Sequence, residues 1–78
     1  MSKSVEIVYC KPYGYEWRAR EVASALRKVF AINARLVPGT GGIFEVRVDE
    51  AVVAKRSIAG FPDTKEIIDA VTAAVKTA

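Results

Sequence analysis

Residues 5–30, VEIVYCKPYGYEWRAREVASALRKVF, carry the pattern that decides the fold. The segment Val5–Cys10 is β-branched or apolar apart from Glu6, which predicts a largely buried strand. Pro12 and Gly14 then break the pattern and indicate a tight connection. From Tyr15 onward the apolar residues recur at steps of three and four, which predicts an amphipathic helix to residue 30. The apolar stripe of this helix comprises Tyr15, Ala19, Val22, Leu26, Val29 and Phe30.

Three further strands and a second helix are predicted downstream. Alternating apolar residues indicate strands at Ile32–Val37, Ile43–Val48 and Ala51–Arg56, where the last two form an antiparallel hairpin. A glycine-rich loop at residues 38–42 separates the first pair of these strands. A second loop is expected at residues 57–62. The final helix then follows Asp63, which has the character of an N-cap.

The order β-α-β-β-β-α defines the expected architecture, which is of the α/β class. The first two strands form a βαβ unit and should be parallel, so the sheet is four-stranded and mixed. Both helices are expected on one face, because the chain is too short for three full layers. A βαβ unit followed by a ββα unit is the minimal arrangement of a thioredoxin-like fold. Residues 1–78 are predicted to form a single domain.

Composition excludes several classes of function. The 78 residues include one cysteine and no histidine, so a disulfide framework, the usual zinc sites and histidine-based catalytic groups are excluded. The net charge of +3 comes without a basic run, which argues against nucleic-acid binding. No apolar run reaches membrane-spanning length, and the first four residues lack signal-peptide character. A cytoplasmic protein is therefore expected.

Cys10 is the one candidate for chemistry. It lies at the predicted end of the first strand, just before a helix whose first turn presents unpaired N–H groups. A thiolate in such a place is stabilised, and Lys11 adds a positive charge. Pro12 and Gly14 shape the same loop. The alternative is that Cys10 is a small buried hydrophobic residue.

Three segments of the chain resemble the selenoprotein W family, also called the Rdx or SelT/SelW/SelH-like family. They are residues 5–15, residues 38–46 (PGTGGIFEV) and residues 60–63 (GFPD), in the family's order and at compatible spacing. The resemblance implies a thioredoxin-like fold and thiol redox function, linked in some members to glutathione. The family carries Cys-x-x-Cys or Cys-x-x-selenocysteine in the first loop. Cys10 matches the first position, and Tyr13 stands at the second.

Two functions are compatible with this departure, and whether the protein is an enzyme is left open. In the first, Cys10 acts as a single thiol that forms mixed disulfides with glutathione, as a co-substrate, or with a protein thiol. In the second, the chain is a non-catalytic protein-binding module, with Trp17 as a possible partner contact because it lies off the apolar stripe. The oligomeric state is open, and a homodimer would cover an exposed edge strand or the free face of the sheet. An anion site at the glycine loop of residues 39–42 is a third alternative, although this loop precedes a strand instead of a helix.

Overall fold

The computed structural model describes residues 4–57 and 60–76 and has the predicted element order. Its strands and helices are β1 (Val5–Cys10), α1 (Glu16–Phe30), β2 (Arg35–Gly39), β3 (Phe44–Val48), β4 (Ala51–Lys55) and α2 (Thr64–Lys76). The strands form one mixed sheet in the order β2-β1-β3-β4. As predicted, β1 and β2 are parallel, and β3 and β4 form an antiparallel hairpin.

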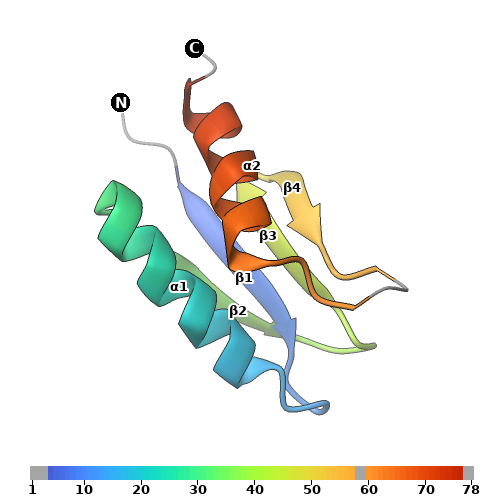
Figure 1. Cartoon of the computed structure of the whole chain (residues 1–78). Helices are drawn as coiled ribbons and strands as arrows, with labels where there is room; N and C mark the ends of the chain where they lie inside the picture. The colour runs from blue at the N-terminus through green and yellow to red at the C-terminus, as the bar shows by residue number, and fades with distance from the viewer. Residues whose placement is uncertain (1–3, 58–59, 77–78) are drawn as a thin grey trace.

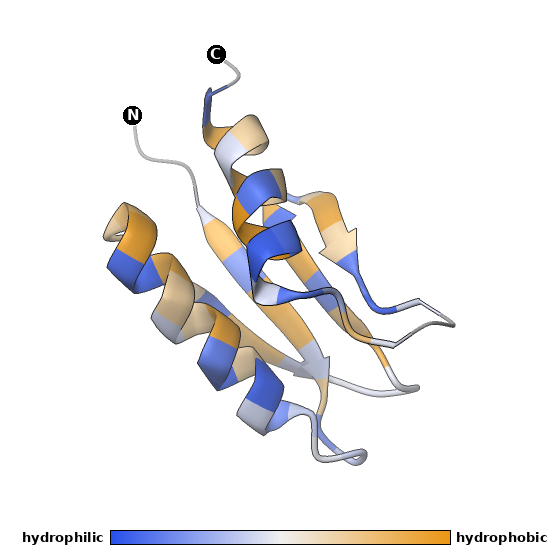
Figure 2. Ribbon diagram, viewed as in Figure 1, coloured by the Kyte–Doolittle hydropathy of each residue, from blue (hydrophilic) through white to orange (hydrophobic). Residues whose placement is uncertain are grey.

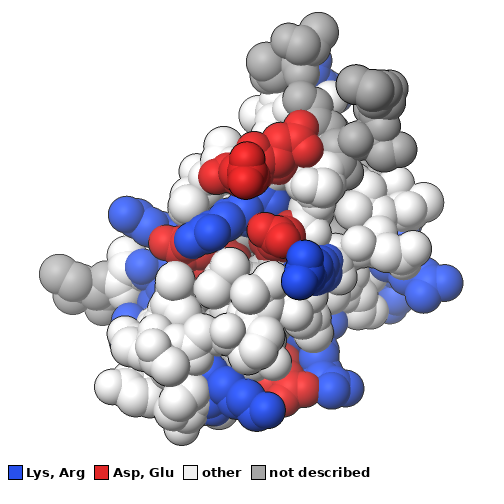
Figure 3. Space-filling view, turned by 180° about the vertical axis from the view of Figure 1, so that it is seen from behind, with Lys and Arg blue, Asp and Glu red and all other residues white. Residues whose placement is uncertain are grey.

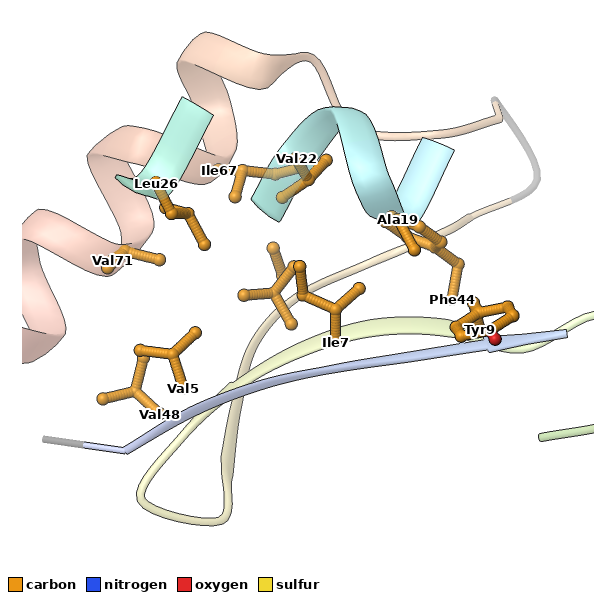
Figure 4. Close-up of a cluster of buried hydrophobic side chains, with 12 residues drawn as sticks. Val5, Ile7, Tyr9, Ala19, Val22, Leu26, Phe44, Val48, Ile67 and Val71 are labelled. Atoms are coloured by element: carbon orange, nitrogen blue, oxygen red, sulfur yellow. The ribbon is translucent and has the colours of Figure 1, made fainter. Parts of the chain in front are cut away.

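Both helices lie on the same face of the sheet and contact each other (Figure 1). Hydrophobic residues follow the strands, and hydrophilic residues lie on the outer sides of α1 and α2 (Figure 2). The close-up shows Ile7 of β1, Val22 and Leu26 of α1, and Ile67 and Val71 of α2 meeting between the layers (Figure 4). The predicted thioredoxin-like α/β architecture is therefore confirmed.

The other face of the sheet carries no helix, and charged groups of both signs lie among uncharged residues on it (Figure 3). Glu6 of β1 forms an ion pair with Arg35 of β2 at 3.7 Å, and Arg47 bonds Glu45 at 2.7 Å. Opposite charges that face each other stabilise a sheet. Charged side chains also allow this face to remain exposed to solvent without a covering helix. Because Val5, Ile7 and Tyr9 face the core, the alternation of β1 places Cys10 on this helix-free face.

Several predicted boundaries are wrong in detail. The second strand was predicted at Ile32–Val37 but runs over Arg35–Gly39, because the Lys11 N–H donates to the Gly39 carbonyl at 3.1 Å and continues the ladder past Pro38. An edge strand tolerates proline because its nitrogen can face solvent. The first helix begins at Glu16, with Tyr15 at its N-cap, and the two hairpin strands are each one residue shorter than predicted.

Two side chains of α1 also lie elsewhere than the pattern indicated. Val29 is 53% exposed, because the buried stripe continues from Leu26 to Phe30 instead. Arg18, whose charge fits a solvated helix face, is only 8% exposed. Its guanidinium donates hydrogen bonds to Pro62 and Thr64, which lie far away in the chain. The predicted loop at residues 57–62 includes residues 58–59, which lie outside the described residues.

The β3–β4 turn is a site of backbone strain. Asp49 and Glu50 both have positive φ, 50° and 74°, as in the type I′ turn that favours glycine. At Asp49 a hydrogen bond offsets the strain, because the carboxylate accepts the Ser4 N–H at 2.9 Å. Glu50 forms no such bond within residues 4–57 and 60–76, so its Cβ strains the turn without this compensation.

Glu50→Gly is therefore expected to raise the free energy of unfolding by about 1 kcal/mol. The matched control is Glu50→Ala, which removes the same charge but keeps the Cβ and should stay near the wild type. Urea denaturation followed by circular dichroism measures both. Equal stabilisation by alanine and glycine would show that charge, rather than backbone strain, is responsible.

Candidate functional site

The β1–α1 loop is fixed by backbone hydrogen bonds. The Gly14 N–H donates to the Lys11 carbonyl at 2.9 Å, and the Tyr15 N–H donates to the Cys10 carbonyl at 3.2 Å. Gly14 has a φ of 76°, which a side chain would strain. The loop therefore has a defined shape, and the segment that the sequence singled out ends β1 and leads directly into α1.

Cys10 is fully buried, with 0% of its surface exposed, although it lies on the face that no helix covers. Its register partner is Gly39. A Cβ built on Gly39 would lie 3.0 Å from Ile43 Cγ2 and 3.4 Å from Val8 Cγ1. Ile43 and Val8 thus fill this end of the face. We infer that the loops which meet here, rather than a helix, exclude water from the Cys10 sulfur.

Tyr13 occupies the second position of the expected thiol motif and points outward. It is 64% exposed, and its ring lies 3.3 Å from the Cβ position of Gly42 in the glycine loop. Lys11 and Pro12 of the same loop are exposed as well. The structure thus brings the β1–α1 loop and the glycine loop together, but it separates a buried Cys10 from an exposed Tyr13.

An aromatic cluster extends from Tyr13 across this end of the molecule. Its members are Tyr13, Tyr15, Trp17, Phe44 and Phe61. Phe61 is central, since its ring centroid lies 4.8 Å from that of Tyr15, 5.1 Å from that of Phe44 and 6.2 Å from that of Trp17, each edge-to-face. Such contacts stabilise aromatic pairs by about 0.5–1.5 kcal/mol beyond the area they bury.

The cluster changes from buried to exposed along its length. Phe44 is in the core, whereas Trp17 is 61% exposed, as its place off the helical stripe predicted. The Arg56 guanidinium lies 5.6 Å from the centre of the Tyr15 ring. The exposed end thus combines large aromatic rings with positive charge, the composition typical of protein-binding surfaces.

Arg18 holds the cluster's central residue in place. Its guanidinium donates to the Pro62 carbonyl at 2.7 Å and to Thr64 Oγ1 at 3.1 Å, and it forms an ion pair with Glu21. These bonds tie α1 to the segment that precedes α2. Phe61 is adjacent to Pro62, so Arg18 is a positioning residue for the aromatic cluster.

Sequence reasoning missed Arg18, Arg56, Phe44 and Phe61 as parts of this site. Phe61 could have been predicted as a site residue, because it lies in the GFPD segment that resembles the family. Among the described residues, no group of three or more histidine, cysteine, aspartate or glutamate side chains is arranged to hold a metal ion. No helix in the described part of the chain is both long and apolar enough to cross a bilayer.

Fold and site together define a class of protein. It is a small thioredoxin-like α/β domain whose first loop begins with a cysteine, in a chain that contains no second one. The sequence profile of the Rdx family matches residues 4–73, and the chain therefore belongs to the Rdx family.

Individual relatives agree with this assignment. The chain is 34% identical over 71 residues to migration and invasion enhancer 1 of Mus musculus and, equally, to that of Bos taurus. Each match covers 86% of this chain and 60% of the relative, so the chain spans less than two thirds of those proteins.

Two solved structures share the fold over nearly the whole chain. A Bordetella parapertussis protein has a TM-score of 0.87 at 29% identity, with 95% of this chain and 99% of that chain covered. A selenoprotein W-related protein from Vibrio cholerae has a TM-score of 0.86 at 25% identity, with 96% and 99% covered.

Proposed function

We propose that this chain is a protein-binding member of the Rdx family that works without a thiol pair, through the exposed end of its aromatic cluster. The observation that carries the proposal is the contrast at the first loop. Cys10 is fully buried, whereas Tyr13 and Trp17, which follow it in the chain, are each more than half exposed. Tyrosine and tryptophan dominate the binding energy of protein interfaces because they bury large rigid surfaces.

The surroundings of these rings support the same function. The ring of Tyr15 contacts that of Tyr13, and the ring of Phe61 contacts that of Trp17. These contacts restrict the exposed rings and reduce the side-chain entropy that is lost when a partner binds. Exposed Lys11 and Arg56 add positive charge at the edge of the surface. The surface therefore suits a protein partner with an apolar pocket and acidic groups around it.

A substitution series tests this function. Trp17→Ala is expected to weaken retention of the cellular partner on the immobilised chain by about 30-fold, the effect of losing a contact worth about 2 kcal/mol. Tyr13→Ala should weaken it as well. Val29→Ala is the matched control, because Val29 is an exposed apolar residue at the far end of the same helix. Cys10→Ser should leave retention unchanged.

The pattern across the variants decides the outcome. Retention lost in Trp17→Ala and kept in Val29→Ala and Cys10→Ser supports the proposal. Retention that depends on Cys10, or that is equal in Trp17→Ala and the wild type, contradicts it. Unfolding curves of each variant show that the fold is intact, and sedimentation velocity shows whether the partner is a second copy of the chain.

The second candidate is a single-thiol redox protein, favoured by the position of Cys10 at the end of β1 next to Lys11 and by membership of the family. The Cys10 thiolate would attack one sulfur of oxidised glutathione, break its disulfide, form a mixed disulfide and release one glutathione thiolate. An external thiol would then resolve the mixed disulfide, because Tyr13 carries no sulfur. This reaction requires the covering loops to open first.

A further inference from the structure

A groove runs between α1 and β2, away from the aromatic cluster. Its volume is about 350 Å³. Its apolar part is formed by Ala23, Ile32, Ala34 and Leu36, all of them partly exposed. The polar lining includes Arg20 and Arg27 of α1, and no acidic side chain lines the groove.

The two arginines differ in whether their charge is paired within the chain. Arg20 bonds Glu16 one turn earlier on the helix, with a distance of 2.9 Å from Nε to Oε2. Arg27 has no ion pair among those formed in residues 4–57 and 60–76, and its side chain is exposed. Its charge is therefore available to a ligand. The chain as a whole is basic, with a net charge of +3, and this favours an acidic ligand.

The groove borders a free sheet edge, since β2 is the outermost strand next to β1 (Figure 1). Because the Gly39 carbonyl accepts the Lys11 N–H, the backbone groups of Gly39 and Val37 face β1. The alternation of a strand then turns the backbone of Leu36 and Pro38 outward. Pro38 has no N–H, so strand addition is confined to the part of β2 near Leu36, which lies at the groove.

We propose that this groove binds an extended acidic peptide segment as an added strand on β2. The backbone of the segment pairs with the outward N–H and carbonyl of Leu36. Its apolar side chains lie on Ala23 and Ile32, and a carboxylate meets Arg27. Main-chain pairing supplies affinity, as in other cases of strand addition. Arg27 adds selectivity for acidic residues through its unpaired charge. This site is separate from the aromatic cluster and does not depend on its function.

The test uses a short acetylated and amidated peptide in which threonine alternates with valine or glutamate (Thr-Val-Thr-Glu-Thr-Val-Thr-Glu), so that the valine and glutamate side chains share the strand face toward α1. It is titrated into the ¹⁵N-labelled chain. The largest amide shifts are expected at Leu36 and in the last turns of α1. The same peptide with lysine for glutamate should bind at least about tenfold more weakly, and added salt should weaken the glutamate peptide. N-methylation of the backbone nitrogens that face Leu36 should abolish the shifts.

Arg27→Glu should reduce the affinity at least about tenfold. Lys76→Glu is the matched control, because it changes the net charge equally on the exposed last turn of the other helix, and should change affinity less than about twofold. Arg27→Gln removes the charge without reversing it and should give an intermediate loss, and the spectrum of each variant reports its fold. Absence of shifts at Leu36, equal binding of the lysine peptide, insensitivity to N-methylation, or equal effects of the two charge reversals would overturn the proposal.

Discussion

Arg18→Ala is expected to lower the free energy of unfolding by about 2–4 kcal/mol. The variant loses charge-assisted hydrogen bonds to the Pro62 carbonyl and to Thr64. One such bond contributes about 1.5–3 kcal/mol, and two bonds from the same guanidinium contribute less than the sum of two separate ones. The variant also leaves the buried Pro62 carbonyl without this donor, which adds a desolvation cost. Such a loss is a large part of the total stability of a small domain.

Arg20→Ala is the matched control for this prediction. Arg20 is two positions along the same helix and also pairs with a glutamate, but its side chain is 71% exposed. Exposed ion pairs contribute little, so the change should stay within about 0.5 kcal/mol. Arg18→Lys should lie between the two, since lysine keeps the charge but not the fork of donors. Urea unfolding of the three variants provides the values, and an Arg18→Ala curve that coincides with that of Arg20→Ala contradicts the role given to Arg18.

The thiol of Cys10 is expected to react with iodoacetamide at least about 100-fold more slowly in the folded chain than in the unfolded chain. A fully buried sulfur reacts only when its cover opens, and each tenfold of protection corresponds to about 1.4 kcal/mol of opening free energy. We expect this opening to be local, because the loops inferred to cover the sulfur can move without global unfolding. The rate is measured by intact mass against time.

Ile43→Ala tests which group provides the cover. Ile43 lies against the Cβ position of Gly39, the register partner of Cys10, so its truncation should raise the alkylation rate about tenfold. Val52→Ala, an exposed apolar truncation on β4, is the control and should leave the rate unchanged. Fast alkylation of the wild-type chain without denaturant contradicts the burial of Cys10.

Local periodicity in the sequence was enough to predict the element order and the layers. The apolar stripe of Tyr15–Phe30 and the alternation in Phe44–Val48 are local signals. In the structure, each of these elements buries the apolar face that its pattern predicts. The end of β2 was missed because Pro38 and Gly39 are turn formers. Only the pairing of Gly39 with Cys10, which depends on tertiary structure, makes them part of a strand.

The candidate site was predictable only in part. The family motif located the loop between Cys10 and Tyr13. The helical spacing predicted that Trp17 is exposed. Burial of Cys10 depends on residues near Gly39 and Ile43, about thirty positions away in the chain, and no local pattern reports it. Burial of Arg18 likewise depends on Pro62 and Thr64, because arginine is ordinarily exposed and is buried only where distant groups accept its donors.

The proposed function requires that Cys10 stays unreactive while the Rdx fold is intact. Incubation of the folded chain with oxidised glutathione, followed by intact mass spectrometry, tests it most directly. The same incubation in denaturant is the control, in which Cys10 should gain the mass of one glutathionyl group. The folded chain should keep its unmodified mass over the same time. A glutathionyl adduct formed on the folded wild type, and absent from Cys10→Ser, would contradict this requirement and establish the single-thiol redox function instead.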